Sequence, residues 1–188
     1  MNSVTHTQIT TICNQNGKTL QILDLNGCKI SGKWEFELQA VQAIVRNCIN
    51  LKEVNFDNTH MSGKAIQYLV ENITPSIEVL SLNYCKWVKD EQIKILVNRC
   101  HELKTLNLAH TSVTSESLTS IIETLKHSLK QLDITGAFGI QPGNFLELRA
   151  MPKLQTLIGS FLLHFKEQLQ NDLPNLVIYN FGSNVDHQ

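Results

Sequence analysis

One short pattern of apolar residues returns along this chain at a nearly constant interval. Its form is L-x-x-L-x-L, with other apolar residues replacing Leu at some positions. The copies begin at Leu20, Leu51, Ile77, Leu103, Leu129 and, in a weaker form, Leu154. Successive copies therefore start 31, 26, 26, 26 and 25 residues apart. A recurring interval of this size indicates units that bury their apolar faces by stacking on one another as a solenoid.

Each unit is expected to contain one strand and one helix. Alternate residues of the pattern face opposite sides of a strand, and the apolar residues that follow recur at helical spacing. Helices are predicted at about 6–14, 35–47, 63–73, 91–99, 116–127, 142–150 and 162–171, with N-caps at Ser62, Asp90 and Ser115. These features predict an α/β leucine-rich-repeat solenoid, a horseshoe with parallel strands on its concave face and helices on its convex face.

The chain is expected to form one domain over residues 1–188, with six to seven repeats and a terminal cap at about 173–188. The long first interval comes from about five extra residues near 31–36, which form either a loop on the binding face or a longer helix start packed by Trp34. The net charge of −1 argues against nucleic acid as a partner. No signal peptide or membrane-spanning run is recognised, and a monomer is expected.

The five cysteines contain no C-x-x-C pair, so neither a metal site nor a cofactor is predicted. Cys28 and Cys85 share one position within their repeats, and Cys48 and Cys100 share another. Cysteines tied to the repeat in this way are expected to be small buried groups. Reduced thiols favour the nucleus and cytoplasm as the location.

Catalysis is not expected from this sequence. It contains no nucleophile elbow, phosphate-binding glycine loop or zinc-protease motif. His60 and His110 follow their strands at neighbouring positions, but two repeats separate them, which is roughly 10 Å at ordinary strand spacing. The chain is therefore predicted not to be an enzyme.

The concave face is the predicted partner-binding surface. Its candidate residues follow from strand alternation and from the loops just beyond the strands: Asp24, Asn26, Glu53, Asn55, Asp57, Ser81, Asn83, Tyr84, Asn107, His110 and Asp133. The face carries four carboxylates and no Lys or Arg, which suits a basic partner. Two alternatives remain: small polar residues are what a crowded strand surface tolerates, and the asparagines Asn26, Asn83 and Asn107 could instead bond to the backbone.

Two aromatic residues lie close together after the third strand. Tyr84 is expected to be exposed. Trp87 occupies the position of Ile30, Met61 and Val113 in other repeats, so it is expected to pack under the turn. The alternative is that Trp87 forms a binding anchor together with Tyr84.

The repeats resemble those of the F-box leucine-rich-repeat proteins. The similarity rests on L-x-x-L-x-L-x-x-C and on the helix ends Asn47–Leu51 and Arg99–Leu103, and it covers most of residues 40–180. It implies a substrate receptor of a cullin-based ubiquitin ligase, which holds a protein substrate such as a phosphorylated cell-cycle inhibitor with a cyclin-kinase accessory subunit. The Leu-Pro-x-Glu-like phrase that opens an F-box is not recognised here. Binding to the ligase adaptor thus requires an F-box elsewhere, and the alternative is a stand-alone scaffold or inhibitor that binds a partner without ubiquitylation.

Overall fold

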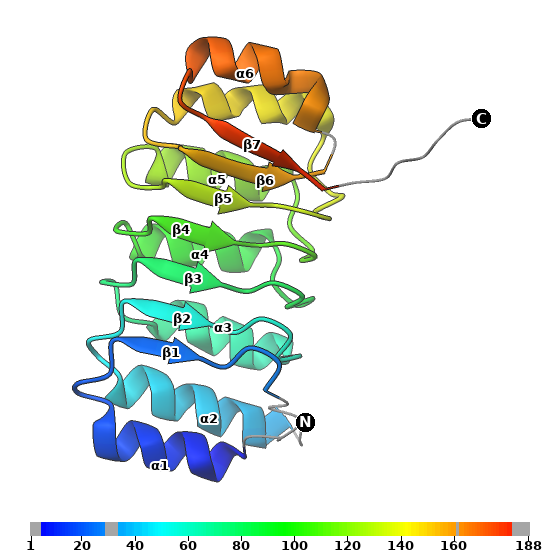
Figure 1. The fold of residues 1–188 in the computed structure, drawn as a ribbon. Helices are drawn as coiled ribbons and strands as arrows, with labels where there is room; N and C mark the ends of the chain where they lie inside the picture. The colour runs from blue at the N-terminus through cyan, green and yellow to red at the C-terminus, as the bar shows by residue number, and fades with distance from the viewer. Residues whose placement is uncertain (1–4, 29–33, 161, 182–188) are drawn as a thin grey trace.

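The computed structural model describes residues 5–28, 34–160 and 162–181. Its seven strands form one parallel sheet in which spatial order follows chain order, from β1 to β7. The strands are β1 (Ile22–Asp24), β2 (Glu53–Asn55), β3 (Val79–Ser81), β4 (Thr105–Asn107), β5 (Gln131–Asp133), β6 (Thr156–Gly159) and β7 (Val177–Asn180). Helices lie on one side of this sheet (Figure 1). The fold is the predicted α/β leucine-rich-repeat solenoid.

The helices fall close to the predicted ranges. They are α1 (His6–Asn16), α2 (Trp34–Asn47), α3 (Gly63–Asn72), α4 (Asp90–Arg99), α5 (Ser115–Leu125), the 3₁₀ helices η1 (Pro142–Ala150) and η2 (Leu162–Phe165), and α6 (Lys166–Asp172). At 142–150 a 3₁₀ helix thus replaces the expected regular helix, whereas at 162–171 only the first turn is 3₁₀ and the regular helix α6 follows. The terminal cap is described only as far as residue 181, and most of the extra segment at 31–36 lies outside the described residues.

Strand register explains the repeat interval. Every strand pairs in step with the next, so Leu80 lies beside Leu106 and Leu106 beside Leu132. These central residues point away from solvent and are fully buried between the sheet and the helices. One core therefore runs the length of the array, and a unit of about 26 residues returns each leucine to the same level.

Two of the three predicted N-caps are wrong by one residue. Ser62 caps α3 as predicted, its hydroxyl accepting from the Ala65 N–H at 3.3 Å. Helices α4 and α5 instead begin at Asp90 and Ser115, so these residues lie inside the first turn. The Asp90 carboxylate has a different role, because it accepts from Thr114 and Ser117 of the next unit.

The cysteines are free thiols, as expected. Cys48, Cys85 and Cys100 are fully buried, while Cys28 is half-buried. Burial raises the pKa of Cys85 and of Cys100 to about 11, which keeps both thiols protonated and unreactive near neutral pH.

Candidate functional site

The open face of the sheet, opposite the helices, is the predicted concave surface. Each strand presents two outward residues on this face, and adjacent strands place them side by side. Most of these side chains are exposed or half-buried, which agrees with the predicted alternation. The outward positions of β1 to β7 contain no Lys or Arg.

Four polar residues at the second outward position form the turns that end their strands. Asp24, Asn55, Asn107 and Asp133 each accept a hydrogen bond through Oδ1 from the backbone N–H two residues later, at 2.9 Å in every case. This Asx geometry provides a partner for a backbone donor where the ladder ends. Asn107 therefore bonds to the backbone of its own unit rather than to a backbone group between stacked strands, and these four candidates help to form the turns whether or not they also bind a partner.

Asp57 corrects the sequence interpretation, because it is buried rather than exposed. Only 9% of its surface is accessible. Its Oδ1 accepts from the Ser81 hydroxyl at 2.6 Å and from the Asn83 N–H at 2.8 Å. Ser81 occupies the position at which β1, β2, β4 and β5 carry Asp or Asn, so Asp57 supplies the missing acceptor from the preceding unit. The accessible carboxylates on the strands are therefore Asp24, Glu53 and Asp133.

A row of residues with left-handed backbone geometry follows the strands at one repeated position. Its members, each with φ between 53° and 67°, are Gly27, Asn58, Tyr84, His110 and Gly136. Glycine adopts this geometry freely, whereas Tyr and His rarely do. The rings of Tyr84 and His110 stack with centroids 4.3 Å apart, and Tyr84 is exposed as predicted. This stacked pair of rings lies at the edge of the open face.

Trp87 corrects the second aromatic prediction. Its side chain is 55% exposed, and the neighbouring Val88 is fully buried. Helix α4 begins 27 residues after α3, whereas α5 begins only 25 residues after α4. The loop before α4 therefore has one additional residue, and Val88 fills the place that Met61 and Val113 fill in other units. The observed exposure favours the alternative in which Trp87 is available to a partner.

The sequence interpretation missed an apolar end of the open face. Val177 and Tyr179 of β7 and the following Phe181 are about half exposed. Register places Ile158 beside Tyr179, and the Phe181 N–H donates to the Gly159 carbonyl at 2.9 Å. These side chains therefore adjoin one another. The alternation of residues 173–181 could have revealed them, but the concave-face positions were assigned only as far as β5.

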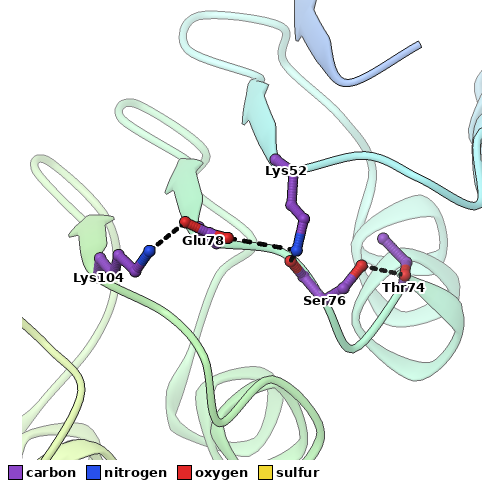
Figure 2. Close-up of polar contacts among 5 residues, drawn as sticks. All are labelled: Lys52, Thr74, Ser76, Glu78 and Lys104. Atoms are coloured by element: carbon purple, nitrogen blue, oxygen red, sulfur yellow. Dashed lines mark hydrogen bonds and ion pairs between the residues drawn. The ribbon is translucent and has the colours of Figure 1, made fainter. Parts of the chain in front are cut away.

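At the other edge of the sheet, two lysines just before their strands are paired with one glutamate. Figure 2 shows Glu78 between Lys52 and Lys104. Lys52 Nζ lies 3.2 Å from Glu78 Oε1 and donates to the Ser76 carbonyl at 3.1 Å. Hydrogen bonds from Lys104 and then Lys52 hold the pKa of Glu78 below its usual range. Lys52 and Lys104 therefore pair with Glu78 and not with Asp24, Glu53 or Asp133.

Within residues 5–28, 34–160 and 162–181, no group of three His, Cys, Asp or Glu side chains could hold a metal ion. The same described ranges include no helix long and apolar enough to cross a membrane.

The geometry is that of a leucine-rich-repeat protein, and comparisons with known proteins agree. A family model described as Leucine Rich repeat matches residues 18–33. The chain resembles the yeast protein Rad7, solved in complex with Elc1, at a TM-score of 0.71 and 17% identity, over 98% of this chain and 46% of that one.

Two further solved structures share the architecture. An internalin from Listeria monocytogenes matches at a TM-score of 0.53 and 16% identity, over 93% of this chain and 51% of that one. Actin-Binding Site 2 of leiomodin-1 matches at a TM-score of 0.52 and 14% identity, over 93% and 90% respectively. At identities of 14–17%, these matches show a shared fold and nothing about function.

Proposed function

We propose that this chain is a protein-binding module that holds an extended segment of a partner across its open face. One observation carries the proposal. Register places Asp133 beside Ile158 and Ile158 beside Tyr179, so a carboxylate adjoins an exposed apolar patch on one accessible surface. Mixed surfaces of this kind, with aromatic residues at an apolar centre, are typical of protein interfaces.

The chemistry of the face defines the partner. Asp24, Glu53 and Asp133 are accessible and would attract Lys or Arg. Ile158, Val177 and Tyr179 would hold an apolar anchor. The matching partner is therefore a basic segment with a large apolar residue at one end.

The particular role proposed is substrate recognition in an F-box-type receptor of a ubiquitin ligase. The supporting features are the repeat motifs shared with F-box leucine-rich-repeat proteins, above all the S-phase kinase-associated F-box protein, and the likeness to Rad7, a solenoid solved in a complex. An accessory cyclin-kinase subunit could contribute to the grip on the substrate. The ligase adaptor would join through an F-box carried elsewhere, and the proposed location is the nucleus and cytoplasm.

Affinity capture with quantitative mass spectrometry tests whether the open face binds the partner. Proteins held by the wild-type chain are expected to fall by about tenfold or more with Glu53→Lys plus Asp133→Lys, and also with Tyr179→Ala. Lys126→Glu, at the exposed end of α5, is the control and should leave capture unchanged. Equal capture by all variants would remove the open face as the site.

The ligase role has its own readout. Adding purified ligase adaptor to the full-length protein should bring the adaptor and the captured partner into one complex. If the protein keeps its partner but does not bind the added adaptor, it acts as a stand-alone scaffold or inhibitor instead.

A further inference from the structure

The N-terminal end of the array contains two buried cysteines on adjoining segments. Cys13 lies on α1 and Cys48 directly follows α2, and each is only 1% exposed. Each thiol shifts the pKa of the other, Cys13 upward and Cys48 downward, so the two side chains lie close enough to interact. The residues next to them confirm that the two segments meet at this level, because Asn47 Nδ2 donates to Asn14 Oδ1 at 3.1 Å.

Close backbone packing holds the two segments together at the same place. Gly17 ends α1, and a Cβ atom at this position would lie 2.7 Å from the Asn47 carbonyl oxygen. Only a residue without a side chain permits this approach. The thiol pair therefore lies where α1 is pressed most closely against its neighbour.

Helix α1 buries fewer side chains than the helices inside the array. It buries only Ile9 and Cys13, whereas α3 buries four side chains and α5 buries five. It also packs against α2 at one end of the array (Figure 1). Elements with few buried apolar side chains open locally at lower free energy than the rest of a structure. Opening of α1 would expose both thiols to solvent while the other units stay folded.

In the closed array, the pKa values of the two thiols shift in opposite directions. The hydrogen bond with Cys13 lowers the pKa of Cys48, whereas the same bond raises the pKa of Cys13. Thiolates are the attacking species in disulfide exchange. Once α1 opens, Cys13 and Cys48 are both accessible to an oxidant, whereas Cys85 and Cys100 stay buried and protonated.

We propose that Cys13 and Cys48 form an oxidation site that closes to a disulfide and locks α1 onto the array. With oxidised glutathione as the oxidant, the Cys48 thiolate attacks the glutathione disulfide and releases one glutathione thiolate. The Cys13 thiolate then attacks the Cys48 sulfur of the mixed disulfide and releases the second glutathione. Two protein thiols are oxidised, one glutathione disulfide is reduced to two thiols, and the two protons pass to the released glutathione.

Non-reducing peptide mapping of the full chain in a buffer of reduced and oxidised glutathione tests the proposal. The Cys13–Cys48 linkage is expected to form at least about tenfold faster than any adduct at Cys85 or Cys100 within the same molecule. Oxidation should raise the Tm by about 5 °C, and dithiothreitol should reverse the shift. Hydrogen exchange in α1 should slow by about tenfold or more in the oxidised protein.

Variants separate this site from general oxidation. Cys13→Ala should abolish both the linkage and the Tm shift. Cys100→Ala is the matched control, because Cys100 shares the repeat position of Cys48, and this variant should retain both effects. The proposal is overturned if Cys48 and Cys100 react at equal rates, if only glutathione adducts accumulate at Cys48, or if the linkage forms only in denaturant. The comparison of rates within the wild-type chain keeps the test valid if a variant folds poorly.

Discussion

At the scale of single residues, Asp57 shows how one unit completes the turn of the next. Its buried Oδ1 accepts from two donors on the following unit. Asp57→Ala would leave those donors unpartnered, and we expect the free energy of unfolding to fall by about 2–3 kcal/mol. Asp24→Ala removes one exposed turn bond and should cost less than about 1 kcal/mol. Urea unfolding measures both, and equal losses would contradict the structural role of Asp57.

Two glycines with the same backbone geometry provide a second prediction. Gly27 and Gly136 have φ values of 66° and 67°. A Cβ atom on Gly27 meets nothing within 4 Å, whereas one on Gly136 would lie 2.4 Å from Nδ1 of His110. Gly27→Ala should therefore cost about 1 kcal/mol of backbone strain, and Gly136→Ala about 1–3 kcal/mol more because the His110 ring must move.

The steric part of this difference can be isolated. His110→Ala removes the ring that the new methyl group would meet. In the double variant, the cost of Gly136→Ala should fall to that of Gly27→Ala, as measured by a double-mutant cycle in urea. A cost that does not change would show that His110 is not the obstacle.

At the scale of elements, Asp90 links the first turns of α4 and α5. Its carboxylate accepts from the backbone N–H and the hydroxyl of both Thr114 and Ser117, at 2.5–3.2 Å. Burial raises the pKa of Asp90, but these hydrogen bonds more than offset it, and the pKa lies below its ordinary value. The charged form is therefore the one that stabilises the folded chain.

A pH dependence follows from that sign. Because the folded pKa is depressed, the stabilisation is complete above the ordinary Asp pKa of about 3.9 and is lost as the pH falls through the lower folded value. Asp90→Ala should lower the free energy of unfolding by about 2–3 kcal/mol at pH 7. Denaturant titrations should show that the difference in free energy of unfolding between Asp90→Ala and wild type narrows below about pH 4. Glu91→Ala, one residue along, should show no such gap at either pH.

Most elements could be predicted from sequence because the same pattern of apolar residues recurs in each unit. The leucine interval gave the strands and their register, and helical spacing gave the helices to within a few residues. Trp87 could not be placed correctly, because one additional loop residue moves Val88 into the core and no local pattern marks that shift. The 3₁₀ form of η1 was likewise missed, since Pro142 begins either kind of helix.

At the scale of the whole molecule, stability is distributed along a stack of like residues. Leu106 is fully buried in this stack, while the adjacent Thr105 faces the open side of β4. Leu106→Asp would place an unpaired charge in the core and should abolish the folded state. Thr105→Asp, one residue away, should leave circular dichroism and gel filtration close to wild type. The opposite result would mean that the two faces of the sheet are assigned the wrong way round.

The exposure of the candidate residues was predicted correctly only in part. Strand alternation identified the accessible Asp24, Glu53 and Asp133. It could not show that Asp57 bonds across to Ser81, because such a bond depends on the neighbouring unit. Whether the remaining candidates bind a partner stays a prediction, which the charge-reversal variants test.

Because the strands pair in step, the distances between side chains along the open face are fixed. Adjacent strands lie about 4.8 Å apart, so Asp24 on β1 and Asp133 on β5, in the same row, are separated by about 19 Å. An extended peptide crossing the strands covers that distance with about six residues. Two cationic side chains six positions apart would therefore reach both carboxylates, whereas closer pairs would reach only one.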